Sequence, residues 1–185
     1  DVQQKVPQLA TEWSLEPDGK SYRFKLRKGV QFHYGMGEFT AQDVVFAWQH
    51  MIAPESKHPH TPRYRTTIED VQVVNDYEVV IKNKQADLAF IWALGEMEGG
   101  FEIISKKDFD AHGGKFPALT ERPLAGTGPY AISEREQARY MRFKAVDNHY
   151  RHTPEFPEFE FRFIKENSTR LAALLSREIQ IAALP

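Results

Sequence analysis

Alternation of apolar and charged side chains predicts a half-buried strand over residues 21–27. The turn sequence Pro17-Asp18-Gly19 precedes this strand, and its glycine can adopt a positive φ. Residues 13–15 are therefore expected to pair back on the strand as a hairpin partner. A second short strand is expected over residues 30–33, before a loop that contains glycine.

A helix is predicted to begin at Thr40. Thr40 and Asp43 have the spacing of a capping box, and Asp43 would lie at the positive end of the helix dipole. Apolar residues then recur at helical spacing until Pro54 ends the pattern. Residues 54–62 are polar and contain three prolines, which is typical of a surface loop.

The middle of the chain reads as hairpins and short helices joined by loops. Asn75-Asp76 tolerates the left-handed conformations of a tight hairpin, and Gly113-Gly114 is a stop signal for a helix. The expected strands are 71–74, 77–82, 101–104, 130–134 and 139–145, the expected helices are 86–94 and 106–112, and 116–125 is an expected loop.

The end of the chain has a different pattern. Residues 158–163 alternate so that three phenylalanines share one face, which requires a covering layer. A helix over 168–177 and a strand over 179–182 would complete a β–α–β unit with a parallel crossover. Because the earlier part reads as antiparallel, the change of pattern places an internal boundary near residue 136, between parts 1–136 and 137–185.

Composition narrows the possible functions. The 185 residues include 24 Lys and Arg against 26 Asp and Glu, a net charge of −2, with 41% hydrophobic and 12% aromatic residues. Near-neutral charge disfavours nucleic acid as a partner, and the composition excludes whole-chain disorder. The absence of cysteine excludes disulfides and cysteine metal sites. The longest apolar run, 88–94, is far shorter than the roughly 20 residues of a membrane span.

Local motifs give little support to catalysis or to a cofactor. Gly126-x-Gly128 resembles a dinucleotide fingerprint only loosely, because no strand precedes it and Pro129 denies an N–H where a helix should start. A hydrolase elbow of the Gly-x-Ser-x-Gly type is absent. We therefore predict no catalytic residues and no cofactor. Glu96, Glu98 and Glu102 are interpreted as a solvated acidic rim.

Histidines offer a metal hypothesis. His58 and His60 lie two residues apart in the proline-rich loop, with His33 and His50 as further candidates. A zinc or nickel site needs three or four ligands, and no carboxylate lies at a recognised spacing. We therefore predict no metal site. Most aromatic residues are expected in the core, but Tyr64 has charged or proline neighbours, which favours a binding role.

Several segments together have the order and spacing of one protein family. They are Pro7-x-Leu9-Ala10-x-x-Trp13, Asp18-Gly19 with Tyr22-x-Phe24-x-Leu26-Arg27-x-Gly29-Val30-x-Phe32-His33, Phe39-Thr40-Ala41-x-Asp43-Val44, Gly126-Thr127-Gly128-Pro129-Tyr130, Asn148-x-Tyr150, and Ser168-Thr169-Arg170-Leu171. The chain resembles the family 5 extracellular solute-binding proteins, the peptide- and nickel-binding receptors of ATP-driven importers, over nearly all its length.

The resemblance implies an α/β fold of mixed α+β type, like the class II periplasmic binding proteins. Family members have several hundred residues, so the chain is interpreted as a fragment. Residues 1–136 would form the small extra domain of antiparallel strands with helices. Residues 137–185 would form a β–α–β part of the first ligand-binding lobe, and the rest of that lobe and the second lobe would be absent.

The resemblance also implies a function. The complete protein would be a non-enzymatic, monomeric receptor that captures oligopeptides and delivers them to an ABC permease. It would be periplasmic or extracellular, with a lipid anchor to the outer face of the cytoplasmic membrane as one means of attachment. His60, and more weakly Tyr64, are carried over as candidate ligand contacts. The alternatives are a nickel or metal-chelate receptor that uses the histidine loop, another small-solute receptor, and, less favoured, a peptidase.

Four positions depart from the family pattern. Tyr34 stands where Asp is usual, Glu38 replaces a common Pro, Arg177 a common Gly and Gln180 a common Asp. All four are expected at turns or strand ends, where they could alter local geometry.

Overall fold

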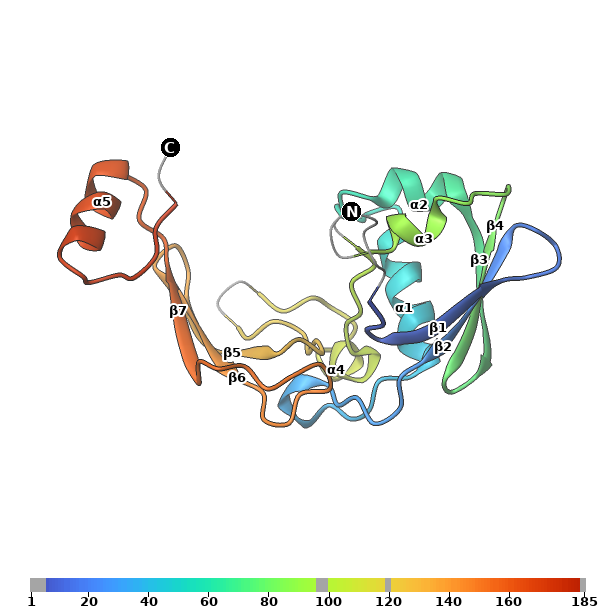
Figure 1. Cartoon of the computed structure of the whole chain (residues 1–185), viewed down its shortest axis with the longest axis horizontal. Helices are drawn as coiled ribbons and strands as arrows, with labels where there is room; N and C mark the ends of the chain where they lie inside the picture. The colour runs from blue at the N-terminus through green and yellow to red at the C-terminus, as the bar shows by residue number, and fades with distance from the viewer. Residues whose placement is uncertain (1–5, 96–99, 119–120, 184–185) are drawn as a thin grey trace. The chain divides into compact units, whose positions relative to one another are not determined.

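The fold divides into two compact units. The computed structural model describes residues 6–95, 100–118 and 121–183 and is traced in Figure 1. The first unit comprises residues 1–116 with 124–127, and the second comprises 117–123 with 128–185.

The first unit combines one four-stranded sheet with short helices. The sheet has the strand order β1-β2-β4-β3, and every neighbouring pair in it is antiparallel. The elements are β1 (Ala10–Leu15), β2 (Ser21–Leu26), the 3₁₀ turn η1 (His33–Gly35), α1 (Ala41–Ile52), α2 (Thr61–Thr67), β3 (Ile68–Asn75), β4 (Glu78–Asn83), α3 (Phe90–Ala93) and α4 (Lys106–Ala111).

The core of this unit lies between the sheet and helix α1. The helix begins after Thr40 with the predicted capping box, and it contacts β3, α2 and α4. Its apolar face is buried, and the apolar positions of β2 and β4 are buried as well. The predicted hairpins 13–15 with 21–27 and 71–74 with 77–82 and the predicted helix over 106–112 are confirmed. The patterns of β2 and β4 match a buried face, whereas Leu15, Val73 and Val74 on the two edge strands are exposed.

Two predicted strands of the first unit are wrong. Residues 30–33 form only a single bridge from Gln31 to Glu38, because positive φ angles at Gly35 and Gly37 turn the chain back at once. Phe32 and Phe39 then pack edge to face, with ring centroids 6.3 Å apart. Residues 101–104 are an irregular segment with no strand partner among the described residues.

The proline-rich loop is shorter than predicted. Helix α2 begins at Thr61, inside the range 54–62 that the sequence pattern assigned to a loop. Pro62 occupies the first turn of the helix, where the missing N–H of proline has no helical partner to lose. The predicted helix over 86–94 is reduced to the single turn α3.

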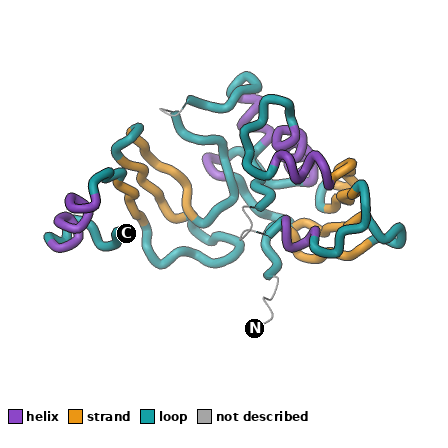
Figure 2. Tube along the Cα trace, turned by 90° about the horizontal axis from the view of Figure 1, so that it is seen from above, coloured by secondary structure: helices purple, strands orange, loops and turns teal. Residues whose placement is uncertain are grey.

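The second unit is a three-stranded antiparallel sheet followed by one helix. Its strands are β5 (Tyr130–Glu136), β6 (Tyr140–Ala145) and β7 (Glu158–Arg162), in the order β5-β6-β7, and the helix is α5 (Asn167–Leu175). The strands run side by side in Figure 2, and in both views α5 lies beyond their end instead of across their face. The three predicted strands and the predicted helix are confirmed.

The predicted β–α–β unit does not form. Residues 179–182 are irregular, Ile181 is 90% exposed, and both described sheets are antiparallel throughout. The phenylalanine face of β7 also lacks the expected covering layer, because Phe161 and Phe163 are about half exposed. A strand needs a hydrogen-bonding neighbour, and the pattern of a segment cannot supply one by itself.

The predicted boundary near residue 136 lies in the turn between β5 and β6. Six pairs of residues connect these strands, from Tyr130 with Ala145 to Glu136 with Tyr140, so both strands belong to the second unit. The assignment of the two parts to lobes of a larger receptor stays a prediction. In the part of the chain that the structure describes, no helix has the length and apolar character needed to cross a bilayer.

Candidate functional site

The predicted contact residues His60 and Tyr64 lie together in the first unit, at the start of helix α2. His60 precedes the first residue of the helix, and its backbone carbonyl accepts the N–H of Tyr64 at 3.0 Å. The two rings are 6.2 Å apart, and the ring of His58 lies 5.7 Å from His60 and 6.0 Å from Tyr64. The structure therefore brings the two histidines and the tyrosine into one aromatic cluster.

Tyr64 is the buried floor of this cluster. It is 1% exposed, and its ring also packs against Phe101 at 5.5 Å. Its hydroxyl donates a hydrogen bond of 2.6 Å to the carbonyl oxygen of Gly100. Burial raises the pKa of Tyr64 to about 12, and the charge of Glu102 adds to the rise. The neutral, buried ring of Tyr64 therefore provides a surface against which the rings of His58 and His60 pack.

His58 is fixed through both of its ring nitrogens. Nε2 lies 2.8 Å from a carboxylate oxygen of Glu102, and Nδ1 lies 3.2 Å from the backbone nitrogen of His60. Since a backbone N–H can only donate, Nδ1 must accept, and the proton of the neutral ring is assigned to Nε2. Sequence reasoning missed Glu102 as a partner because it lies 44 residues from His58 and reads as one of several solvated acids.

The loop that carries the histidines is tied to helices α1 and α2. The hydroxyl of Thr61 donates to the carbonyl of Met51 at 2.6 Å and lies 3.0 Å from the hydroxyl of Ser56. The oxygen of Ser56 in turn accepts the backbone N–H of His58 at 3.3 Å. His60, which is partly exposed, is thus held at the surface by a loop with defined hydrogen bonds.

The other two candidate histidines belong to different surroundings. His50 packs against Phe46 and Phe109, with centroid distances of 4.2 and 4.6 Å, and the backbone of His33 donates to Gly126. Among the described residues, no group of three or more His, Asp or Glu side chains is placed to hold a metal ion. Of the predicted acidic rim, Glu96 and Glu98 lie outside the described residues.

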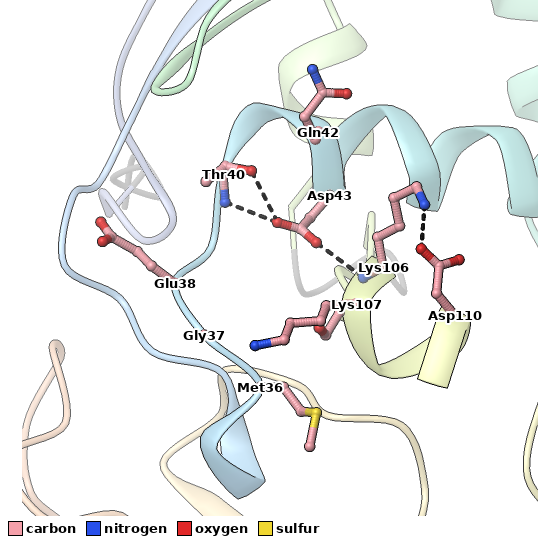
Figure 3. Close-up of a pocket in the computed structure, with 10 residues that line it drawn as sticks. Met36, Gly37, Glu38, Thr40, Gln42, Asp43, Lys106, Lys107 and Asp110 are labelled. Carbon is pink, nitrogen blue, oxygen red and sulfur yellow. Dashed lines mark hydrogen bonds and ion pairs between the residues drawn. The ribbon is translucent and has the colours of Figure 1, made fainter. Parts of the chain in front are cut away.

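A separate pocket of about 370 Å³ lies where the first turns of α1 and α4 meet (Figure 3). The Asp43 carboxylate joins the two helices, because it accepts the backbone N–H groups of Thr40 at 2.9 Å and Lys106 at 3.0 Å. The Lys106 ammonium pairs with Asp110. Of the charged side chains that line this pocket, Asp43 holds the two helix ends together and Lys106 and Asp110 pair within α4, and neither His60 nor Tyr64 lines it.

The start of the segment Gly126-Thr127-Gly128-Pro129-Tyr130 is anchored in the first unit. The fully buried carboxylate of Asp108 accepts the backbone N–H of Ala125 at 2.7 Å. The backbone N–H of Ser105 donates to the carbonyl oxygen of Ala125 at 2.9 Å. The N–H of His33 donates to the carbonyl of Gly126 at 2.9 Å. The backbone at the start of this part of the shared sequence pattern is therefore held in place by hydrogen bonds within the first unit.

The fold and the sequence define a class of protein. The model of the family "Bacterial extracellular solute-binding proteins, family 5 Middle" matches residues 4–185. The chain belongs to this family, and the class predicted from its motifs is confirmed. Mixed α and β structure of the periplasmic-binding-protein kind is likewise confirmed by the solved structures that the chain matches.

Three relatives illustrate the range of ligands. A dipeptide-binding protein of Pseudomonas aeruginosa is 28% identical, over 97% of this chain and 37% of its own length. The periplasmic binding protein DppA of Helicobacter pylori, solved with the peptide STSA, is 27% identical with a TM-score of 0.80, over 94% of this chain and 36% of its own. NikZ of Campylobacter jejuni, solved with Ni(L-His), is 26% identical with a TM-score of 0.81, over 94% and 34%.

The length comparison limits what the chain holds. It spans little more than a third of these relatives, while nearly all of it is matched. A ligand site built from the whole length of such a protein would draw only part of its residues from these 185 positions. The activity of the whole protein is therefore a matter for proposal.

Proposed function

We propose that this chain is part of the substrate-binding component of an ABC importer, which captures peptides outside the cytoplasmic membrane and delivers them to a membrane permease. The observation that carries the proposal is the family membership together with the peptide-binding relatives that cover almost the whole chain. The complete receptor works as a monomer and performs no covalent chemistry. Its place is periplasmic or extracellular.

His60 is proposed as the ligand contact and Tyr64 as its support. His60 is partly exposed at the end of a hydrogen-bonded loop, so its imidazole can donate to or accept from a peptide group. Tyr64 is buried beneath it, and its proposed contribution is to hold the ring in place. An extended peptide would be held mainly through its backbone, and closure of two lobes over it would add contacts that only the closed state makes.

The test is a calorimetric titration of the natural gene product that carries this sequence, with the dipeptide Met-Leu and the tetrapeptide STSA as probes. We expect binding of at least one probe, and a five- to tenfold weaker affinity for His60→Ala, which is the loss of about one hydrogen bond. His152→Ala in the exposed loop of the second unit is the matched control and should bind like the unchanged protein. If neither probe binds, the peptide assignment is rejected.

The 185-residue chain alone should bind Met-Leu weakly or not at all, because most of the length of its relatives lies outside the part that it matches. NMR titration of the chain at millimolar peptide measures this directly. A micromolar dissociation constant would mean that the site is complete within these residues.

A nickel or metal-chelate receptor is the second candidate. NikZ, solved with Ni(L-His), is as similar in fold as the peptide receptor, and the rings of His58 and His60 lie 5.7 Å apart, although nickel binding by His58 would require it to give up its bond to Glu102 or to the His60 N–H. Titration of the natural gene product with Ni(L-His) decides between the two functions. Nickel binding that disappears in the His58→Ala, His60→Ala double variant, without peptide binding, would favour this alternative. Another small solute has similar support, since the binding protein MoaA, solved with mannopinic acid, is 28% identical with a TM-score of 0.82. A peptidase activity has no supporting feature among the described residues.

A further inference from the structure

The ring of His58 connects two residues that the sequence keeps apart. On one side, Nε2 lies 2.8 Å from the carboxylate of Glu102, and on the other, Nδ1 accepts the backbone N–H of His60 at 3.2 Å. The ring is 20% exposed and stacks on Tyr64 with an angle of 23° between the planes. These three contacts restrict both the position and the rotation of the imidazole.

The contacts at the two ring nitrogens select the same chemical form of the ring. The N–H of His60 requires a lone pair on Nδ1, so the proton of the neutral ring belongs on Nε2. Nε2–H then points at the Glu102 carboxylate, which is an acceptor and strengthens the bond because it is charged. A proton on Nδ1 would place two donors face to face and would release the backbone of His60.

We propose that His58 is a positioning residue, which in its Nε2-protonated form holds the backbone of His60 in place while Glu102 fixes the ring. The role of this positioning in ligand binding rests on the proposed function, in which His60 contacts the ligand. Glu102 is mostly exposed, so its contribution is orientation of the ring rather than a large energy. Tyr64 supplies the flat, uncharged surface against which the ring is held.

Two conservative variants separate the two nitrogens. The side-chain oxygen of asparagine can replace Nδ1 as acceptor, so His58→Asn should retain the bond to the His60 amide and lose the contact with Glu102. Glutamine reaches the position of Nε2, so His58→Gln should keep a donor for Glu102 and lose the acceptor for His60. Glu102→Gln still offers an oxygen to Nε2–H and is the control that should leave the tautomer unchanged.

The experiment is ligand-free NMR on the 185-residue chain. At neutral pH, long-range ¹⁵N–¹H spectra should show the proton of His58 on Nε2. Amide exchange at His60 should be roughly five- to tenfold faster in His58→Gln and within about twofold of the unchanged chain in His58→Asn, which corresponds to one net hydrogen bond. Unchanged amide spectra of helix α1 would show that each variant remains folded.

A proton on Nδ1, or equal acceleration of exchange in the two variants, would overturn the proposal. Both readouts are made without ligand. If the natural gene product fails to bind Met-Leu or STSA, the function proposed above fails, while the positioning of His60 by His58 stands or falls on the NMR result alone.

Discussion

The hydroxyl of Tyr64 reaches across 36 positions of sequence to the carbonyl oxygen of Gly100, with a bond of 2.6 Å that is closed off from solvent. Tyr64→Phe removes the donor and leaves a buried carbonyl without it. We expect the free energy of unfolding of the first unit to fall by about 1 to 3 kcal/mol. Urea unfolding followed by tryptophan fluorescence measures this, because all three tryptophans, Trp13, Trp48 and Trp92, belong to that unit.

Tyr130 provides the matched control for this substitution. Its hydroxyl also donates to a backbone carbonyl, that of Phe156 at 3.0 Å, but at an exposed position of the second unit. Tyr130→Phe should change the stability of the second unit, measured by amide exchange in its sheet because that unit holds no tryptophan, by no more than about 0.5 kcal/mol, since water can replace the lost donor. Equal effects of the two substitutions would mean that the burial of the Tyr64 hydroxyl contributes nothing.

Alkaline pH should weaken the first unit through the same side chain. Burial raises the pKa of Tyr64 from its ordinary value near 10 to about 12, so the folded state holds its proton more tightly than the unfolded state does. The resulting stabilisation is complete below pH 10 and is lost as the pH rises through 12. A rise of this size in the pKa of Tyr64 corresponds to about 2 to 3 kcal/mol of folding free energy.

The Tyr64→Phe variant isolates this contribution from the other tyrosines. Urea unfolding of both proteins between pH 8 and 12 should show the stability advantage of the unchanged chain decreasing above pH 10. A difference that stays constant over this range would mean that Tyr64 titrates alike in the folded and unfolded states.

Local sequence patterns predicted the elements whose partners are close in the chain. The β3–β4 hairpin turns at Asp76 and Tyr77, directly after Asn75 and without the left-handed backbone expected at Asn75-Asp76. Helix α1 begins at its predicted capping box, because that signal is contained in a few neighbouring residues. The strand expected over 179–182 failed, because a strand depends on a neighbour that the described residues do not provide. The apolar pattern of residues 179–182 thus indicated a preference for strand, but without a neighbouring strand the segment is irregular.

The candidate site shows the same division. His60 and Tyr64 were selected by resemblance, and the spacing of four residues at the start of a helix explains why they meet. Glu102 carries no signal that would connect it with His58, since the two come from segments that meet only in the folded chain. The burial of Tyr64 was also unexpected, because its sequence neighbours Arg63 and Arg65 are charged and exposed while its own ring lies in the core.

Arg177 is a position at which a departure from the family pattern should cost stability. It follows helix α5 with φ of +62°, a conformation that favours glycine, the residue common there in the family. The backbone N–H groups of Arg177 and Glu178 donate to Leu174 and Ala173, the two bonds of a Schellman motif. Arg177→Gly should therefore stabilise α5 by about 0.5 to 1 kcal/mol.

Helix content at 222 nm during thermal unfolding, or amide exchange in α5, measures the effect of Arg177→Gly. Ser176→Gly is the matched control, because Ser176 has a φ of −75° and gains nothing from the freedom of glycine. That control should be neutral or destabilising. Stabilisation by both substitutions would place the effect in side-chain solvation and not in the left-handed backbone.

Glu38, which replaces a proline common in the family, makes hydrogen bonds that stabilise the fold. One of its carboxylate oxygens accepts the backbone N–H of Gly29 at 2.6 Å and the hydroxyl of Tyr77 at 2.9 Å, so it joins the turn after β2 to the β3–β4 hairpin. These two bonds, that of Gly29 first, lower the pKa of Glu38 below its ordinary value of 4.5. The folded state therefore favours the charged carboxylate over the protonated form.

The sign of the pH effect follows from the direction of that shift. Because the pKa of Glu38 is lower in the folded state, its stabilisation is present above pH 4.5 and disappears as the pH falls through the folded value. Glu38→Gln keeps an oxygen acceptor without the charge and should be less stable than the unchanged chain at pH 7, with the difference shrinking below pH 4.5. Tyr77→Phe removes one of the two donors and should retain part of the pH dependence. Urea unfolding at pH 7, 5 and 3 compares the three proteins, and a gap that widens toward pH 3 would contradict the role of the charged carboxylate.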